Sequence, residues 1–209
     1  PEYEFEFVGR DDGINGEAVG IAYRKDRFKA LESGRFWLSP TPDTPSNAQA
    51  WGGPERHRVA IWIKFEDMKT GKRFYYLSTH LEVGRQHAGV RAESARLIIA
   101  KEKEINTEKL PFFMDGDHNP SEQTEEMLPK FRRYFVDSFH RAYDAGTLHG
   151  PAGTYNGFNP DADLSSHNKK GDYIFGKGAY ELKRYEAVTK KYDGQYPSDH
   201  LAVVIRVRL

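Results

Sequence analysis

Hydrophobic and polar positions alternate with a period of two at the start of the chain, where Tyr3, Phe5 and Phe7 are separated by glutamates. This period puts every second side chain on the same face of a β-strand. Further short runs rich in β-branched and aromatic residues predict more strands. These runs are Ala18–Arg24, Val59–Phe65, Phe74–Leu81, Pro111–Met114, Ile174–Phe175, Tyr180–Thr189 and Leu201–Val207. The pattern therefore predicts a protein built mainly of strands.

The surroundings of three runs indicate how they are placed. A turn-rich tip at residues 68–72 joins Val59–Phe65 to Phe74–Leu81, so these two runs are expected to form a hairpin. Pro111–Met114 is wholly apolar and ends at an acidic turn, as expected of a buried strand that emerges at a sheet end. Leu201–Val207 is apolar enough to be expected at the centre of a sheet.

Two segments have the spacing of helices. In Val90–Ile105, alanines and isoleucines gather near one face and charged residues lie elsewhere, and Glu122–Phe131 follows a Pro-Ser start signal. Ser39–Arg58 is rich in proline and glycine and is expected to be a long loop, a type of segment that is usually functional or disordered. Many strands with few helices indicate sheets covered by helices, in an α+β or α/β sandwich.

Composition narrows the class of protein. With 209 residues, 38% hydrophobic and 30% charged, the chain is long and apolar enough for one substantial soluble domain. The 31 basic and 31 acidic side chains cancel, which disfavours a protein that clamps long nucleic acid through charge but leaves a local basic patch open. No run approaches the length of a membrane span. The absence of cysteine excludes disulfides, thiolate zinc sites and a cysteine nucleophile.

The first residues have no initiator methionine, no basic segment and no apolar segment of a targeting signal. They have the pattern of the middle of a strand. We therefore expect that residues precede Pro1 in the native protein.

Four short strings place acidic, amide or imidazole groups at predicted strand ends. They are Ser78–Glu82, Gly116–Pro120, Gly171–Phe175 and Pro197–His200. Sites collect at strand ends because a rigid element positions groups that a loop exposes. Taken alone, each string has an ordinary interpretation. Asp117 would hold a turn, His80 would be a half-buried histidine, and Asp199 with His200 would be a polar pair at the surface.

Taken together, the strings predict an anionic pocket rich in oxygen atoms, with imidazoles at its rim. Its donors would be three aspartates, one asparagine and two histidines, without any thiol. Hard oxygen ligands suit Mg²⁺, with Mn²⁺ or Ca²⁺ as alternatives. Such a metal most often polarises a phosphoryl group and activates water.

The order THLE, GDHN, DYIF and SDH resembles that of the endonuclease/exonuclease/phosphatase superfamily, whose usual strings are TH(F/L)D, GDFN, DYIF and SDH. The upstream strings GRDDG, YRKDRF and FWLS resemble the small bacterial members, which are often exported, and so favour an exported protein. The resemblance covers nearly the whole chain. It implies an α+β fold of the deoxyribonuclease I type, a four-layer α/β/β/α sandwich with two mostly antiparallel sheets face to face and helices outside.

The resemblance also implies a single domain over residues 1–209 that lacks its first strand and helix. The family's asparagine on the first strand and its metal-binding glutamate after the first helix would lie before Tyr3. Glu17 is a conceivable substitute for that glutamate, but we do not favour it.

Specific roles follow from the resemblance. His80 would donate to the scissile phosphate, and Arg58 would also contact it. Asp117 would orient the attacking water or the leaving oxygen beside the metal, and both Asp117 and Asp199 are expected as metal ligands. Asn119 would hold a phosphate oxygen.

At the other side of the expected pocket, His200 would serve as general base or as a phosphate-binding imidazole. Asp172 would orient it, because a carboxylate fixes the tautomer and favours the imidazolium. Arg10 and Asn156 are expected at the rim, in contact with the substrate.

Two positions depart from the family pattern. Glu82 and Val83 stand where related bacterial members often have Asp-His, which would alter substrate contacts. His118 replaces the phenylalanine of GDFN, and a packed neutral histidine is favoured there over an added polar contact.

The combined interpretation is a monomeric, divalent-metal-dependent phosphoester hydrolase that uses in-line attack of water. The zero net charge favours a small phosphodiester or phosphomonoester, such as a lipid head group or a sugar phosphate. A nuclease and a non-catalytic phosphate-binding module of the same fold stay open as alternatives. A zinc metallohydrolase is disfavoured because the sequence has no HxH or HExxH string.

Overall fold

The computed structural model of the protein describes residues 2–119 and 126–209. Its helices are α1 (Ala88–Ile105), α2 (Met127–Tyr134) and α3 (Ser138–Asp144), with single 3₁₀ turns at Gln49–Trp51, Arg85–His87 and His167–Lys169. Its strands are β1 (Tyr3–Gly9), β2 (Ala18–Arg24), β3 (Phe28–Trp37), β4 (Val59–Asp67), β5 (Arg73–His80), β6 (Phe112–Asp117), β7 (Val136–Asp137), β8 (Leu148–His149), β9 (Asp172–Lys177), β10 (Glu181–Val188) and β11 (Ala202–Arg208).

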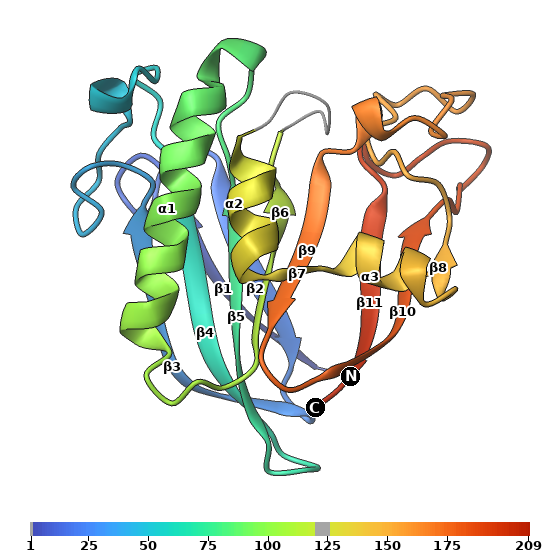
Figure 1. Ribbon diagram of the computed structural model, residues 1–209, viewed down its shortest axis with the longest axis horizontal. Helices are drawn as coiled ribbons and strands as arrows, with labels where there is room; N and C mark the ends of the chain where they lie inside the picture. The colour runs from blue at the N-terminus through green and yellow to red at the C-terminus, as the bar shows by residue number, and fades with distance from the viewer. Residues whose placement is uncertain (1, 120–125) are drawn as a thin grey trace.

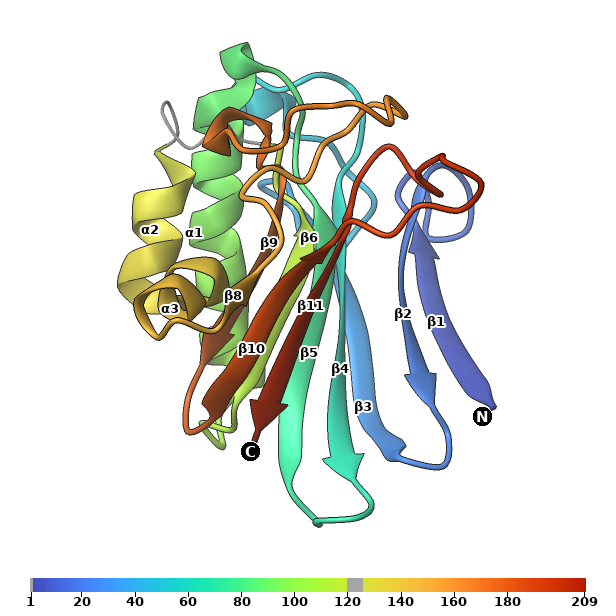
Figure 2. The same ribbon diagram turned by 90° about the vertical axis from the view of Figure 1, so that its right-hand side faces the viewer.

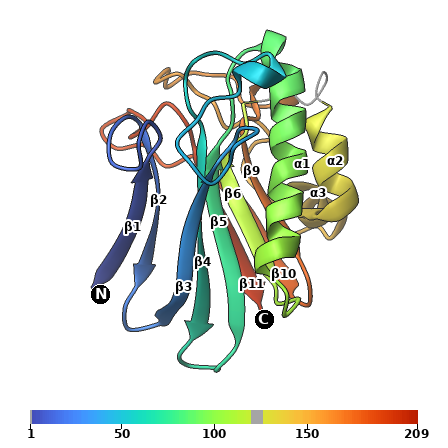
Figure 3. The same ribbon diagram turned by 90° about the vertical axis from the view of Figure 1, so that its left-hand side faces the viewer.

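A six-stranded sheet in the order β3-β4-β5-β6-β9-β7 is the centre of the molecule. The strands β5 and β6 run parallel because α1 carries the chain between them, and the other neighbours in this sheet are antiparallel. The helices α1 and α2 cover one face of the sheet (Figure 1). The hairpin of β1 and β2 lies beyond the opposite face (Figure 3).

That opposite face is covered by two smaller sheets, β1-β2 and β11-β10-β8 (Figure 2). Between β2 and β11 the covering is open, and a cavity of about 670 Å³ lies there. It is lined by Ile21 on β2, by Val203 and Ile205 on β11, and by Phe74 and Phe113 of the six-stranded sheet. Among the described residues, the edges of β2 and β11 that face each other have no strand partner, and they border a mostly apolar cavity that Arg27, Asp67 and Asp115 also line.

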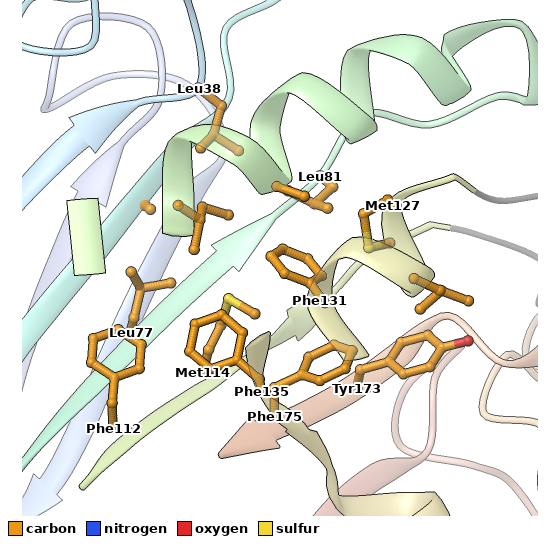
Figure 4. Close-up of a cluster of buried hydrophobic side chains, with 14 of the residues drawn as sticks. Leu38, Leu77, Leu81, Phe112, Met114, Met127, Phe131, Phe135, Tyr173 and Phe175 are labelled. Carbon is orange, nitrogen blue, oxygen red and sulfur yellow. The ribbon is translucent and has the colours of Figure 1, made fainter. Parts of the chain in front are cut away.

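Alternation along the central strands divides the core into two halves. On β4, Ala60 packs toward the helices, while Ile61 and Ile63 pack toward β1 and β2. The half under the helices contains aromatic rings such as Phe131 and Phe175, whose centroids are 5.2 Å apart (Figure 4). Complete burial of such a side chain stabilises the fold by about 1.5–3 kcal/mol.

The structure confirms the α+β sandwich and most of the expected strands. The expected hairpin is the antiparallel pair β4–β5, and Ala18–Arg24 has the bounds of β2. The buried run before GDHN is β6, which lies between β5 and β9. The first helix begins two residues before the expected Val90 and ends at Ile105, as expected.

Several expectations need correction. Leu201–Val207 is not central: among the described residues β11 pairs with β10 alone, and its residues alternate between exposed and half-buried. The second helix begins at Met127 and continues to Tyr134, while residues 122–125 of the expected segment lie outside the described residues. The strand β3 and the helix α3 were not expected from the sequence.

In the part of the chain that the structure describes, no helix is long and apolar enough to cross a membrane.

The helices α1, α2 and α3 lie on one side of the six-stranded sheet (Figure 2). The described residues thus contain a layer of helices and two layers of sheet.

The approach of β5 to β6 depends on Gly116. Its φ is +144°, and a Cβ atom built there would lie 1.8 Å from the carbonyl oxygen of Thr79. Any side chain would push the two strands apart at the point where β6 leads into Asp117. We expect Gly116→Ala to lower the free energy of unfolding by at least about 2 kcal/mol, measured by chemical denaturation followed by circular dichroism.

Gly71 provides the matched control. It also has positive φ (+69°), but a Cβ there would meet nothing within 4 Å. Gly71→Ala should therefore cost only the backbone strain, about 1 kcal/mol. Equal costs for the two variants would contradict the steric explanation.

Candidate active site

Strand register sets three polar side chains in a row. His80 at the end of β5 is the register partner of Asp117 at the end of β6, because these strands are parallel. Asp117 is in turn paired with Asp172, the first residue of the antiparallel strand β9. Residues 80, 117 and 172 thus become neighbours across three adjacent strands.

His200 reaches this row from the segment before β11. Its Nδ1 lies 2.7 Å from Oδ2 of Asp172, and its ring contacts Tyr155 with 5.1 Å between centroids. The hydrogen bond to Asp172 is the main reason why the pKa of His200 rises to about 9. Near neutral pH this side chain is therefore an imidazolium that faces the pocket through Nε2.

Asp117 lies between the two imidazoles. Its Oδ2 is 3.5 Å from Nε2 of His80 and 3.9 Å from Nε2 of His200. Its Oδ1 accepts a hydrogen bond from the backbone N–H of Asn119 at 2.8 Å. Burial and then the nearby charge of Asp172 raise the pKa of this carboxyl group. A cation bound beside Asp117 would stabilise its ionised form and so oppose both causes of the raised pKa.

Glu17 supplies a partner for His80 that the sequence had not indicated. It stands directly before β2, and its Oε1 lies 2.7 Å from Nδ1 of His80. Burial opposes ionisation of Glu17, but the charges of His80, Arg10 and Arg58 outweigh it and lower its pKa. The sequence raised Glu17 as a conceivable substitute for the metal-binding glutamate. Its pairing with the imidazole of His80 offers another reason for its position at the site.

The surroundings of His80 favour its neutral form. Burial, and then the positive charge of Arg58, lower its pKa, although Asp117 and Glu17 oppose the shift. Its ring lies between two carboxylates, with Glu17 at 2.7 Å from Nδ1 and Asp117 at 3.5 Å from Nε2. An incoming anion would favour protonation at Nε2.

Two arginines expected at the site lie beside His80. The guanidinium of Arg58 is 7% exposed and has its Nη1 atom 4.0 Å from Glu17, and Arg10 forms an ion pair with the same carboxylate. A small cavity is bordered by Arg10, Glu17, Arg58 and His80. The Nε atom of Arg10 is buried and has no hydrogen-bond partner in the described structure.

The residues of the GDHN string have distinct positions. The side-chain amide of Asn119 donates to the carbonyl oxygen of Leu81 at 3.0 Å, and the backbone of Asn119 has positive φ (54°). His118 is fully buried against the rings of Phe131, Tyr173 and Phe175. Burial lowers the pKa of His118 to about 4, so it is the packed neutral histidine that the sequence favours.

Asn156 is held by the backbone around it, including the backbone of Asp199. Asn156 is 4% exposed, and its side chain bonds Ser198 O at 3.0 Å and Phe158 N at 2.8 Å. Its backbone N–H donates to Asp199 O at 2.8 Å. This geometry favours a positioning role for Asn156 over the substrate contact that the resemblance implies, which stays a prediction.

Asp117, Asp172 and His200 form a group whose ligand atoms all lie within 4.8 Å of one another, and Asp199 is not a member of it. Two carboxylates at this spacing fit a hard divalent cation. However, Asp172 and His200 already hold each other, and an imidazolium repels a cation. The carboxylate of Asp117 is therefore the group best suited to hold a metal, and the expectation for Asp199 stays a prediction.

Comparison with known proteins gives a consistent result. The chain is similar to a mannosyl-6-phosphatase from Bacteroides thetaiotaomicron, with 32% identity and a TM-score of 0.86 over 100% of this chain and 78% of that chain. An endonuclease/exonuclease/phosphatase family protein from the same organism has 33% identity and a TM-score of 0.85 over 99% of this chain and 73% of that one.

The human nocturnin catalytic domain, at 19% identity and a TM-score of 0.73 over 99% of this chain and 72% of that domain, shares the fold. No protein-family model and no curated protein matches the sequence. The identities of 32% and 33% over more than two thirds of each structure show that the chain belongs to the endonuclease/exonuclease/phosphatase family of metal-dependent phosphoester hydrolases.

Proposed function

We propose that the protein hydrolyses a small phosphoester by in-line attack of water on phosphorus at the row of His80, Asp117 and Asp172. The observation that carries this proposal is the placement of Asp117 between two imidazoles, each with its own carboxylate partner. Such an arrangement offers hydrogen-bond donors to a phosphoryl group and a carboxylate to the water beside it. The water oxygen gives up one proton and forms the new bond to phosphorus while the bond to the leaving oxygen breaks. The leaving oxygen takes up one proton, so the reaction consumes one water in total.

Hydrogen-bond donors would surround the phosphoryl group from two sides. Arg58 and a protonated His80 would bind it from one side, and the imidazolium of His200 would donate from the other side. Asn119 has one amide hydrogen engaged with Leu81 O, so its second hydrogen would hold a phosphoryl oxygen. The charge that develops on these oxygens in the transition state is met by groups that are already oriented.

Of the two roles considered for His200, the structure favours the phosphate-binding imidazolium over the general base. A group with a pKa of about 9 is protonated near neutral pH and has no free lone pair at Nε2. Asp117, with its raised pKa, would orient the attacking water.

A divalent cation would be held chiefly by Asp117, with Mg²⁺ preferred because the donors are oxygens. When bound there, it would neutralise charge on the phosphoryl oxygens.

A sugar phosphate is the favoured substrate. The similar mannosyl-6-phosphatase, by its name, acts on a phosphorylated sugar. The 31 basic and 31 acidic residues provide no excess positive charge for a long polyanion, which argues against duplex nucleic acid.

Substrate class can be tested with a hexose 6-phosphate, a chromogenic bis-ester and supercoiled plasmid DNA, each with Mg²⁺ and with EDTA. We expect phosphate release from the hexose 6-phosphate that EDTA abolishes, and intact plasmid. Plasmid cleavage would support the nuclease instead. No turnover with any divalent metal, together with phosphate binding that survives EDTA, would support the non-catalytic module.

Removing a single side chain of the site should lower kcat strongly. Asp117→Ala and His200→Ala should each lower kcat by at least about a hundredfold, the scale on which acid–base and electrostatic groups contribute. The exposed residues His149 and Asp161 provide controls of the same chemical types, and their alanine variants should keep wild-type kcat. Retained activity in either site variant would exclude the assigned site.

The pKa of His200 can be measured in the metal-free protein by NMR titration of its imidazole. We expect a value of about 9, falling toward 6.5 in Asp172→Asn, because the hydrogen bond to Asp172 is the main cause of the shift. A pKa that is raised in the folded state stabilises it at low pH. The loss of unfolding free energy in Asp172→Asn should thus be complete below pH 6.5 and vanish as the pH rises through about 9. An unchanged titration in the variant would contradict the pairing.

A further inference from the structure

A buried carboxylate behind the site lies between two arginines. The side chain of Glu82 is 2% exposed, and its Oε1 accepts a hydrogen bond from Nη2 of Arg56 at 2.6 Å. Its Oε2 accepts from Nε of Arg58 at 3.3 Å. Burial opposes ionisation of Glu82, but the two arginines outweigh it and lower its pKa. One carboxylate thus serves two guanidinium groups.

The position of Glu82 is fixed independently of these arginines. The backbone N–H of Val83 donates to its Oε1 at 3.0 Å. Arg91, buried on α1, donates to the carbonyl oxygen of Glu82 at 2.5 Å and to that of Gly84 at 2.8 Å. The loop after β5 is therefore attached to the helix that covers the central sheet, and Glu82 is a rigid acceptor.

This acceptor contacts Arg58 only at Nε. The guanidinium group is planar, so a hydrogen bond at Nε also sets the direction of the two Nη groups. One of them, Nη1, lies 4.0 Å from Oε1 of Glu17. The same guanidinium borders the small cavity beside His80, and its charge lowers the pKa of His80. The Nη1 group thus lies on the side of the site.

We propose that Glu82 is a positioning residue that orients Arg58 toward the phosphoryl group. This inference rests on the proposed function, because it assumes that Arg58 contacts an anion. Glu82 does not touch the substrate and acts through the arginine. Arg56, which is more exposed, completes the neutralisation of the buried carboxylate. The Nη1 end of Arg58, which Glu82 does not hold, lies beside Glu17 at the catalytic row.

A double-mutant cycle tests this coupling, with the affinity of the metal-free protein for inorganic phosphate measured by isothermal titration calorimetry. Glu82→Gln should weaken phosphate binding about tenfold, because a misdirected guanidinium loses charge-assisted hydrogen bonds. Arg58→Gln should weaken it by at least as much. The double variant should bind no more weakly than Arg58→Gln alone, because Glu82 has nothing left to orient. Glu82→Asp keeps the charge and should recover part of the affinity.

Glu102 provides the matched control for loss of a buried carboxylate. It is 1% exposed and forms an ion pair with Lys177 at 2.8 Å, with Tyr134 and Asn106 as further partners. Glu102→Gln should leave phosphate affinity unchanged, and circular dichroism should show that it and Glu82→Gln are folded. Wild-type affinity in Glu82→Gln, or losses that multiply in the double variant, would overturn the proposal.

Measuring phosphate affinity, and not hydrolysis, separates this inference from the proposed function. Phosphate binding with the expected cycle, but without hydrolysis of any phosphoester, would refute the catalytic proposal and leave the role of Glu82 intact. Absence of phosphate binding by the wild-type protein would overturn the role of Glu82.

Discussion

The pairing of the parallel strands β5 and β6 is the constraint on which the site depends. It places His80 beside Asp117, and the antiparallel partner β9 adds Asp172 on the next strand. Gly116 lets β6 approach the Thr79 backbone just before Asp117. Because side chains in one register row have little freedom to separate, the sheet fixes the row of His80, Asp117 and Asp172. His200 and Glu17 reach this row from segments outside the strands.

Acidic and basic side chains are paired around the row. Asp172 pairs with His200, Glu17 with His80 and Arg10, and Glu82 with Arg58 and Arg56, with Asp117 between the two imidazoles. Buried charges are tolerated only when such partners are present. The result is a pocket in which each group is oriented before an anion arrives. That preorganisation is what phosphoryl chemistry requires, since the protein contributes mainly position and charge.

Sequence patterns foresaw much of this fold because period-two runs such as Ala18–Arg24 and the hairpin turn at residues 68–72 are local signals. They placed Leu201–Val207 wrongly because apolar content does not reveal how many neighbours a strand has. Residues at strand ends, such as Asp117 and Asp172, were found through their strings. Glu17 and Glu82 were not assigned their partners, because those contacts join segments 63 and 24 to 26 positions apart and no local pattern encodes them.

His80 has a carboxylate at each ring nitrogen, and this feature has a consequence for the energetics of ligand binding. The imidazole faces Glu17 through Nδ1 and Asp117 through Nε2, and its surroundings lower its pKa. An anionic ligand that enters between them favours an added proton, which must come from the solvent. The measured enthalpy of binding then includes the heat of ionisation of the buffer that gives up that proton. The calorimetric enthalpy would accordingly differ between phosphate-free buffers such as Tris and cacodylate, while the underlying contacts stay the same.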